Sequence, residues 1–367
     1  MKKILVLNYE FPPLGGGAAN ATYYLLREFS SYPDLKIDLV TSSVDEFRVE
    51  KFSDNITIHY LDINKKGNLH YQSIKDLLIY SWRSCRYCKE LKKRKNFDLV
   101  HAFFGIPCGY IAMKLKIPYI VSLRGSDVPF YNKRFYWLDL FVFKRLSKKI
   151  WENAKAVITN SQGLKDLALK SCLKQEQKIE VIYNGVDIKE FTPNECKKKN
   201  DKLVLISTGR LITRKGYSFL IEAIADLSTI ELWLIGDGNL KEELENQAKN
   251  QNAQVKFLGK KNHEEIAGLL KQADVFVLPS LNEGMSNSIL EAMACGLPII
   301  TTDTGGSVEL IKDNGFIVEK KSPESIKEAV IKISNNAELI NFMSKMSRNV
   351  AEKMSWTKVA DSYIKKY

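Results

Sequence analysis

The stretch Asn282-Glu-Gly-Met-Ser-Asn-Ser-Ile-Leu-Glu-Ala-Met-Ala-Cys-Gly-Leu-Pro298 follows a short apolar run, Asp274–Leu278. The apolar run predicts a buried strand, and the small polar residues Ser286–Ser288 predict the first turn of a helix. A strand, a loop and a helix in this order are the repeating unit of a doubly wound α/β domain. The backbone N–H groups of the first turn would then face the carboxyl edge of the sheet, where an anion can bind.

Two carboxylates, Glu283 and Glu291, flank this helix start, although a helix N-terminus attracts anions. A ligand that carries both phosphate and sugar explains the combination. Backbone amides would bind its phosphate, and the carboxylates would accept hydrogen bonds from its hydroxyl groups. The stretch therefore predicts a site for a phosphorylated sugar.

The composition is that of a soluble globular protein, since 45% of the 367 residues are hydrophobic and 27% are charged. The length predicts two domains. The apolar run after Met1 is too short for a signal peptide, and no segment is long enough to span a bilayer, so we expect a cytoplasmic protein. The formal charge of +12 favours an anionic partner such as nucleic acid, a membrane surface or a phosphorylated ligand.

Short strands rich in Val, Ile and Leu alternate with helical segments along most of the chain, which is typical of βα units around parallel sheets. The strands expected in the first half are Ile4–Asn8, Lys36–Thr41, Ile56–Tyr60, Leu99–Ala102, Tyr119–Leu123, Ala156–Thr159 and Ile179–Ile182. Those expected in the second half are Leu203–Ser207, Glu231–Ile235, Val255–Phe257, Val275–Leu278, Ile299–Thr301 and Phe316–Val318.

The two series of elements predict two similar doubly wound domains, residues 1–183 and 184–350, joined near Asn184–Lys202. The closing stretch Ala337–Tyr367 is helical by pattern and has no strand of its own. We expect residues 351–367 to form a helix that packs back on the first domain. Two facing domains would present the carboxyl ends of both sheets to one ligand.

The loop after the first expected strand contains Gly15, Gly16 and Gly17 and leads into a helix. Three glycines permit positive φ angles and a close approach of the backbone to a ligand. The dinucleotide spacing Gly-x-Gly-x-x-Gly fails because Asn20 occupies the third position, and no Walker Gly-Lys-Ser/Thr follows. A ligand-binding loop and a simple flexible turn both remain open.

Two cations, Arg210 and Lys215, follow the first strand of the second series. A guanidinium and an ammonium at a strand end can neutralise a diphosphate. Arg214 lies beside them and is interpreted as a solvated loop residue. Gly236 and Gly259 follow the next two strands, where the backbone could approach a nucleotide.

Together these motifs resemble the family 4 retaining glycosyltransferases of the GT-B fold, over nearly the whole chain. The resemblance rests on the glycine-rich first loop, Asp98–His101, Arg124–Asp127, Asn184–Asp187, Gly209-Arg210 with Lys215-Gly216, and Glu283 to Glu291, the Glu-x7-Glu motif followed by Gly-Leu-Pro. It implies an α/β fold of two facing Rossmann-like doubly wound domains with a cleft between them. The first domain would bind the acceptor, the second would bind a nucleotide-sugar donor, and a C-terminal helix would cross back.

The resemblance also implies roles for individual residues. Arg210 and Lys215 would bind the donor diphosphate, Glu291 the ribose, and Glu283 the hydroxyl groups of the transferred sugar. The other donor-binding positions are backbone or loop positions. They are Gly15, Gly16 and Gly17, which would close over the donor, Gly236 and Leu258 near the nucleotide and its base, and Gly284, Met285, Ser286 and Asn287 at the phosphate and sugar.

The implied reaction transfers a hexose or an N-acetylhexosamine from a UDP- or GDP-linked donor to a glycan or lipid-linked acceptor, with retention at the anomeric carbon, in cell-surface polysaccharide biosynthesis. The cations and the helix N-terminus would stabilise the departing nucleoside diphosphate more in the transition state than in the ground state. No Asp-x-Asp follows a strand and the four histidines are dispersed, which favours catalysis without a metal, and no cofactor is expected.

Arg124 departs from the family pattern, in which many relatives have a histidine before Gly-x-Asp. An arginine cannot act as a general base at neutral pH, so Arg124 is expected to pair with the donor phosphate or to orient Asp127. His101 is then the nearby imidazole, and a catalytic and a structural role for it both remain open. The catalytic candidates are therefore Glu283, Arg124, Asp127 and His101.

Acceptor binding is expected in the first domain, because donor groups occupy the second. Two stretches there are basic and aromatic, Tyr80–Lys95 and Lys133–Trp151. They could lie on an anionic membrane, at the inner face of the plasma membrane, and meet a lipid-linked acceptor. In the alternative, the lysines are merely solvated outside an inward apolar face. That face would hold Phe135, Leu138, Val142 and Leu146.

Other classes of protein are less well supported. A sugar-nucleotide epimerase or a phosphorylase could share the fold, but the Glu-x7-Glu motif favours transfer. A non-catalytic sugar-binding or accessory subunit is disfavoured because Arg210, Lys215, Glu283 and Glu291 are all present. Nucleic-acid binding rests on charge alone and has no matching module, so we expect none.

Overall fold

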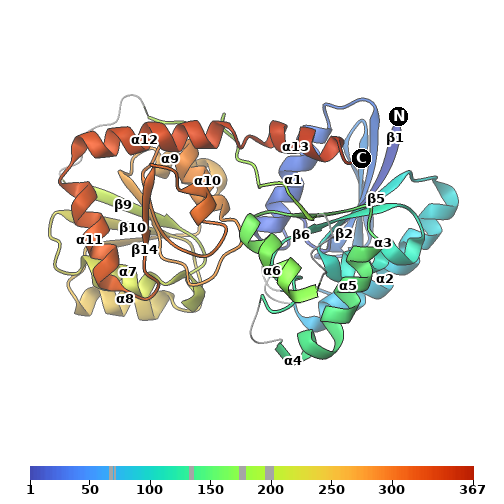
Figure 1. Ribbon diagram of the computed structural model, residues 1–367, viewed down its shortest axis with the longest axis horizontal. Helices are drawn as coiled ribbons and strands as arrows, with labels where there is room; N and C mark the ends of the chain where they lie inside the picture. Colours follow the sequence, from blue (N-terminus) through green and yellow to red (C-terminus); the bar gives the residue numbers. More distant parts are fainter. Residues whose placement is uncertain (66–68, 70–71, 132–135, 173–178, 195–201) are drawn as a thin grey trace. The chain divides into compact units, whose positions relative to one another are not determined.

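The computed structural model describes residues 1–65, 69, 72–131, 136–172, 179–194 and 202–367 (Figure 1). Internal contacts divide the chain into two units: unit 1 holds Met1–Asn184 and Trp356–Tyr367, and unit 2 holds Gly185–Ser355. Each unit is a mainly parallel sheet with helices packed on its faces, which is the doubly wound arrangement that the sequence predicts. Residues 195–201 of the predicted connection lie outside the described part.

The described residues of unit 1 form one eight-stranded sheet in the order β3-β4-β2-β1-β5-β6-β7-β8. The strands are β1 (Lys2–Leu7), β2 (Leu35–Ser43), β3 (Arg48–Ser53), β4 (Ile56–Asp62), β5 (Leu99–Phe103), β6 (Tyr119–Leu123), β7 (Ala156–Thr159) and β8 (Ile179–Val181). The helices are α1 (Gly17–Phe29), α2 (Ile74–Arg94), α3 (Tyr110–Leu115), α4 (Tyr136–Leu138), α5 (Lys144–Glu152), α6 (Gln162–Cys172) and α13 (Trp356–Ile364), with π-helical turns at Gly105–Gly109 and Asp139–Phe143.

The central strands of this sheet are apolar because helices cover them on both faces, as the side chains of Ile4–Leu7 in β1 show by their complete burial. β3 is the strand that the sequence did not predict. Its residues Arg48–Ser53 are largely charged and exposed, and it pairs antiparallel with β4 at the edge of the sheet. An edge strand needs no apolar face, so its composition gave no strand signal.

The described residues of unit 2 form a six-stranded parallel sheet in the order β11-β10-β9-β12-β13-β14. The strands are β9 (Leu203–Thr208), β10 (Ile230–Ile235), β11 (Val255–Gly259), β12 (Val275–Leu278), β13 (Ile299–Thr302) and β14 (Gly315–Val318). The helices are α7 (Tyr217–Ile224), α8 (Lys241–Asn250), α9 (His263–Leu270), α10 (Asn287–Ala294), α11 (Pro323–Ser334) and α12 (Ala337–Glu352), with 3₁₀ turns at Thr213–Lys215 and Val308–Leu310. Each strand lies within three residues of its predicted position.

The two closing helices belong to different units. α12 is part of unit 2, whereas α13 is part of unit 1 and lies against α1 (Figure 1). The ring of Trp356 in α13 stacks on Tyr24 of α1, with ring centres 5.6 Å apart and planes 7° apart. Tyr363 and Tyr367 are buried in the core of unit 1. Unit 1 is therefore built from both ends of this sequence.

Candidate functional site

The candidate site of unit 2 lies where the strand order reverses. After β9 the chain continues to β10 on one side, and β12 pairs with the other side of β9. In open parallel sheets, ligands bind outside the carboxyl ends of the strands at such a point. Lys215 follows β9 and Glu283 follows β12, and the Nζ of Lys215 lies 2.7 Å from Oε1 of Glu283. Two of the residues predicted to bind the donor therefore meet at this edge.

The Lys215–Glu283 pair is largely buried, with side-chain exposures of 11% and 14%. Burial alone would raise the pKa of Glu283. The charges of Lys215 and Arg214, with hydrogen bonds from Lys215 and Ser280, outweigh burial and hold that pKa below its usual value. Glu283 is therefore ionised at neutral pH and can accept hydrogen bonds from a ligand.

Gly216 fixes the position of Lys215 beside the sheet. Its φ angle is +69°, and a Cβ atom at this position would lie 2.2 Å from the carbonyl oxygen of Pro279 at the end of β12. Only glycine tolerates both the backbone conformation and the close approach. The dipeptide Lys215-Gly216 thus allows the loop after β9 to pack against the end of β12.

The N-terminus of α10 adjoins Glu283. Ser286 is its N-cap residue, yet the Ser286 side chain caps no backbone group among the described residues, and its hydroxyl lies 3.0 Å from that of Ser288. Glu283 forms a parallel bridge with Gly305, and Met285 is buried, so the loop Glu283–Asn287 is held in place. This arrangement suits an anion at the first turn of α10.

Glu291 lies about one turn into α10, in a different environment from Glu283 in the preceding loop. Its Oε1 is 3.9 Å from Nδ1 of His263 at the start of α9, and the ring of Phe191 meets the edge of that imidazole at 6.2 Å between centres. Burial, with the like charge of Glu190, raises the pKa of Glu291 to about 8. A protonated Glu291 can donate a hydrogen bond as well as accept one.

The raised pKa of Glu291 predicts a pH-dependent stability. The folded protein keeps this proton up to about pH 8, whereas an unfolded glutamate releases it near about pH 4.3, so the free energy of unfolding falls as pH rises between these values. Glu291→Gln removes the titration. Between pH 5 and pH 8 we expect the Tm of the wild type to fall by about 7–14 °C relative to Glu291→Gln, measured by calorimetry.

Glu265→Gln provides the control for this pH profile. Glu265 lies on α9, accepts a hydrogen bond from the backbone of Asn262, and pairs with Lys261, which together hold its pKa below the usual value. It is already ionised throughout the range, so its Tm difference from the wild type should stay constant. Parallel profiles for wild type and Glu291→Gln would contradict the raised pKa.

The ends of β10 and β11 lie along the same edge of the sheet as the site. The N–H of Gly209 donates to Ile235 O at 2.9 Å, and the N–H of Gly236 donates to Gly259 O at 2.8 Å. A Cβ atom at Gly259 would meet no described atom within 4 Å, so open space lies beside Leu258-Gly259. The side chain of Arg210, just after Gly209, is exposed. These positions can contact a ligand that extends across the edge from β12 toward β11.

In unit 1 the strand order reverses between β1 and β5, and Arg124 follows the neighbouring strand β6. The guanidinium of Arg124 lies over the ring of Phe103 at 4.7 Å, and its Nη1 donates to Oδ1 of Asn184 at 2.8 Å. Its Nε and Nη2 are buried and have no hydrogen-bond partner among the described residues. Buried guanidinium nitrogens without partners are costly, so this group is suited to an anionic oxygen of a ligand.

Asp127 is held by backbone groups rather than by the Arg124 side chain. Its Oδ1 accepts from the N–H groups of Arg124 and Gly125 at 2.9 and 3.0 Å, and its Oδ2 accepts from Gly105 at 2.7 Å. Burial raises its pKa, and these hydrogen bonds oppose the rise. The sequence suggested that Arg124 orients Asp127. In the structure, the carboxylate of Asp127 instead holds the backbone of the loop that carries Arg124.

His101 is completely buried in β5. Its Nδ1 lies 2.7 Å from the hydroxyl of Tyr367, and its Nε2 lies 2.8 Å from that of Ser122. Burial, with the charge of Arg124, lowers its pKa well below the usual value. Both ring nitrogens are engaged in the core, so this environment favours the structural role of the two that the sequence left open.

The glycine-rich loop of unit 1 is a shaped turn. Gly15 has a φ angle of +94°, its N–H donates to Leu69 O at 2.9 Å, and a Cβ atom would lie within 3 Å of the side chain of Glu10. Gly16 precedes α1, which begins at Gly17. The turn therefore requires glycine at position 15 for its own geometry. Contact of Gly15–Gly17 with a ligand stays a prediction.

The predicted inward face of Lys133–Trp151 forms only in part. Leu146 packs against the core of unit 1, but Val142 is exposed. Phe135 and the side chain of Leu138 lie outside the described residues. The alternative of a buried apolar face therefore fails at Val142, and its neighbours Trp137 and Phe141 are exposed as well.

Sequence reasoning missed two residues of the candidate site. Arg214 was interpreted as solvated, but its charge acts on Glu283. Its position directly before Lys215 could have indicated that Arg214 lies near the same site. His263 was not singled out, because it lies at the start of α9, far in sequence from Glu291, and approaches it only when β11 and β12 take their places in the sheet.

Comparison with known proteins decides the family. The profile described as "Glycosyltransferase Family 4" matches residues 15–190, and that described as "Glycosyl transferases group 1" matches residues 188–352. An uncharacterised glycosyltransferase of Methanocaldococcus jannaschii is 31% identical over the whole chain and 97% of its own length. The chain belongs to the group 1, family 4 glycosyltransferases. It therefore transfers a sugar from a nucleotide-sugar donor, and neither an epimerase nor an accessory subunit is favoured.

Two further proteins, one by sequence and one by structure, are similar to this glycosyltransferase. The UDP-Gal:α-D-GlcNAc-diphosphoundecaprenol α-1,3-galactosyltransferase of Escherichia coli is 28% identical over 95% of the chain and 92% of its own length. Sucrose-phosphate synthase from Thermosynechococcus elongatus superimposes with a TM-score of 0.85 at 20% identity, over 100% of this chain and 98% of that one. The second similarity supports the two-unit doubly wound fold.

Proposed function

We propose that this glycosyltransferase transfers a hexose or an N-acetylhexosamine from a UDP- or GDP-linked donor to a glycan or lipid-linked acceptor, with retention at the anomeric carbon. The observation that carries the proposal is the buried Lys215–Glu283 pair beside the N-terminus of α10. One cation, one ionised carboxylate and a helix start at a strand-order reversal match the phosphate and the hydroxyl groups of a sugar nucleotide.

The donor diphosphate binds Lys215, Arg210 and the amides of the loop Gly284–Asn287 in this proposal. When the bond between the sugar and the diphosphate breaks, negative charge grows on the departing phosphate oxygen. Groups that are already oriented toward that oxygen stabilise the transition state more than the ground state. Glu283 accepts hydrogen bonds from hydroxyl groups of the sugar and so positions the anomeric carbon. Lys215 stabilises the negative charge on the departing diphosphate. No metal takes part, and activity should survive a chelator.

The nucleoside lies further along the same edge. Glu291 hydrogen-bonds the ribose hydroxyl groups, and its proton at neutral pH allows one donated and one accepted bond. The open space at Leu258-Gly259 takes the base, with Gly236 beside it. In unit 1, Arg124 binds an anionic oxygen of a substrate through Nε and Nη2, which have no partner among the described residues, and Asp127 positions it.

The acceptor is proposed to be glycan or lipid-linked, in cell-surface polysaccharide biosynthesis. The E. coli relative acts, by its name, on a diphosphoundecaprenol-linked sugar. None of the helices in the described part of the chain combines the length and the apolarity needed to cross a bilayer. We therefore propose a peripheral position at an anionic membrane, on the cytoplasmic side, for the meeting of enzyme and lipid-linked acceptor.

A donor screen tests the proposed function. A ligand that binds only the folded protein stabilises it, by about 2.7 kcal/mol at a concentration of 100 times Kd. We expect one class of nucleoside diphosphate sugar, UDP- or GDP-linked, to raise Tm by about 5–10 °C. The shift should vanish in Lys215→Met and persist in Lys256→Met, since Lys256 pairs with Glu231 on the exposed edge at β11. The donor-site proposal fails if no nucleoside diphosphate or its sugar shifts Tm.

A further inference from the structure

The guanidinium of Arg124 in unit 1 forms no ion pair with a carboxylate of the described residues. Its Nη1 donates to Oδ1 of Asn184 at 2.8 Å, and its Cζ lies 4.7 Å from the centre of the Phe103 ring. Its Nε and Nη2 are buried and have no hydrogen-bond partner within the described part of the chain. An amide and an aromatic ring thus surround this charge, but no counter-ion does.

Two lysines with buried side chains provide a comparison within the protein. The side chain of Lys65 is 3% exposed, and its Nζ lies 2.7 Å from Oδ2 of Asp76. The side chain of Lys215 is 11% exposed, and its Nζ lies 2.7 Å from Oε1 of Glu283. Burial of a charged nitrogen without such a partner is costly. Arg124 is the exception, and we expect its counter-ion to come from a ligand.

Two ionisable groups at the same edge of the sheet do not supply this anion. Oδ1 of Asp127 accepts from the backbone N–H groups of Arg124 and Gly125, and its Oδ2 accepts from that of Gly105. Burial, with the charge of Arg124, lowers the pKa of His101 well below its usual value, so the imidazole is neutral. No other charge of the described residues contributes to that shift. Arg124 is therefore the cation that acts alone on this part of the edge.

Nε and Nη2 form one edge of the guanidinium plane. Nη1 lies on the side of Cδ, so the N–H of Nε and one N–H of Nη2 point in the same direction. Two parallel donors match the two oxygens of one carboxylate, whereas a single hydroxyl group satisfies only one of them. Asn184 engages Nη1 and Phe103 supports the plane, so the fork is oriented before a ligand binds.

A phosphate group also offers two oxygens, but it matches this place less well than a carboxylate. A phosphate monoester carries a charge of about −1.5 to −2 at neutral pH, which one guanidinium neutralises only in part. The donor diphosphate has its own proposed groups in unit 2, namely Lys215, Arg210 and the start of α10. A carboxylate carries a single negative charge. Among hexoses, the uronic acids carry such a group at C6.

We propose that Arg124 binds the carboxylate of an acidic sugar, so that one of the two substrates of this glycosyltransferase is a uronic acid. The acid is either the transferred hexose in its C6-oxidised form or a residue of the acceptor glycan, and Arg124 recognises the same group in both. The inference rests on the proposed function and names a substrate class for it. A neutral hexose leaves Nε and Nη2 without an anion, so Arg124 determines specificity for the acid.

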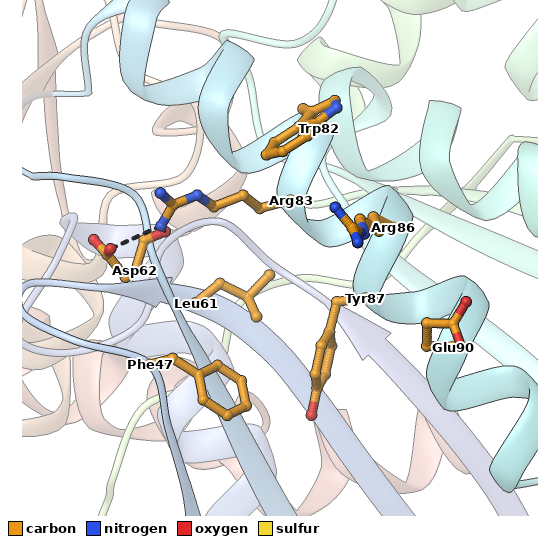
Figure 2. Close-up of a pocket in the computed structure, with 8 residues that line it drawn as sticks. All are labelled: Phe47, Leu61, Asp62, Trp82, Arg83, Arg86, Tyr87 and Glu90. Atoms are coloured by element: carbon orange, nitrogen blue, oxygen red, sulfur yellow. Dashed lines mark hydrogen bonds and ion pairs between the residues drawn. The ribbon is translucent and has the colours of Figure 1, made fainter.

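The cavity of about 360 Å³ beside α2 contains two further guanidinium groups, those of Arg83 and Arg86 (Figure 2). Their surroundings differ from those of Arg124. Nη1 of Arg83 lies 2.8 Å from Oδ2 of Asp62, and Arg86 is exposed to water. A hydrated guanidinium needs no counter-ion from a ligand. Arg86→Gln therefore removes one positive charge from the same unit outside the proposed site, and it serves as the matched control.

Binding of paired probes to the full chain tests the proposal. The donor pair is UDP-glucuronic acid and UDP-glucose, or GDP-mannuronic acid and GDP-mannose if GDP is the nucleotide that raises Tm. The acceptor pair is methyl glucuronide and methyl glucoside, added in the presence of that nucleotide. In one of the two pairs, titration calorimetry should show the acid binding about 10- to 100-fold more tightly than its neutral counterpart. The pair that shows the preference identifies the acidic substrate.

Variants of Arg124 assign the preference to its guanidinium. Arg124→Gln should abolish the preference for the acid, and Arg124→Lys should keep only part of it, because an ammonium lacks the fork. Arg86→Gln should leave it unchanged. The nucleotide alone should still raise the Tm of Arg124→Gln, since its proposed groups belong to unit 2.

Several results would overturn the proposal. One is equal binding of acid and neutral probe in both pairs. Another is glucose 6-phosphate that binds more tightly than methyl glucuronide and depends on Arg124, because the anion would then be a phosphate. A third is a fall of more than about 5 °C in the Tm of ligand-free Arg124→Gln, which would show a structural role. If a nucleotide raises Tm but neither acid is preferred, the substrate class is wrong and the donor site stands. If no nucleotide raises Tm, the proposed function fails and this inference fails with it.

Discussion

Replacing Lys215 by methionine is expected to lower kcat/KM for sugar transfer by about 10²–10³-fold, measured as release of nucleoside diphosphate in the presence of acceptor. Methionine keeps the apolar stem that packs beside Gly209 and removes only the charge. The departing diphosphate then loses a preoriented cation. Glu283 also loses the partner that lies 2.7 Å away, so its pKa will rise and less of the ionised form will be present to orient the sugar.

A second substitution separates the effect on stability from the effect on catalysis. Lys215→Met leaves the carboxylate of Glu283 buried with Arg214 as the remaining nearby cation, which lowers the free energy of unfolding. Adding Glu283→Gln removes that buried charge and should restore much of the stability without restoring activity. Lys256→Met, which breaks an exposed ion pair on β11, should stay within about twofold of wild type. Retention of more than half of the wild-type kcat/KM in Lys215→Met would refute the assigned role.

Arg124→Ala is expected to abolish most transfer, again by about 10²–10³-fold in kcat/KM. Its Nε and Nη2 are buried without partners among the described residues, so the guanidinium is held ready for an anionic oxygen. Arg124→Lys should recover only part of the activity, because an ammonium lacks the planar fork that binds two oxygens. The measurement is steady-state transfer with donor and acceptor varied separately.

Asn184→Ala is the matched control for Arg124. Among the described residues, Oδ1 of Asn184 accepts the hydrogen bond that Nη1 of Arg124 donates, at 2.8 Å, and Asn184→Ala removes this bond but leaves the charge in place. If Arg124 acts through its charge on a substrate, Asn184→Ala should retain activity within about fivefold. An equal loss in both variants would show that the contact between the two residues is what matters, and near wild-type turnover in Arg124→Ala would remove the residue from the site.

The sequence predicted the sheets well because parallel strands are buried on both faces and must be apolar along their length. Thirteen of the strands found correspond to apolar runs such as Val275–Leu278. The sequence did not predict β3, because this edge strand has no such apolar run. The sequence placed Lys215 and Glu283 in two loops that each follow a strand. Their direct contact could not be predicted without the strand order, which places β9 beside β12.

Side-chain environments were harder to predict than positions. His101 and Arg124 follow or lie in neighbouring strands, so the sequence placed both near one edge. It could not show that Tyr363 and Tyr367, from the far end of the chain, enclose the imidazole. Nor could it show that the two glutamates of one motif have opposite ionisation states. Glu283 is ionised beside Lys215, whereas burial and the like charge of Glu190 keep Glu291 protonated at neutral pH.

The division of the closing helices between the units also bears on the order of events at the ribosome. Unit 2 is one continuous segment, Gly185–Ser355, whereas unit 1 needs Trp356–Tyr367 to fill its core. Domains usually mature in the order in which they are synthesised. Here the second unit is complete before the first has its final helix, so nascent unit 1 exposes the sites of Trp356, Tyr363 and Tyr367 throughout translation of unit 2. Until those residues are added, this apolar surface stays exposed to solvent, and exposed apolar surface of this kind favours aggregation.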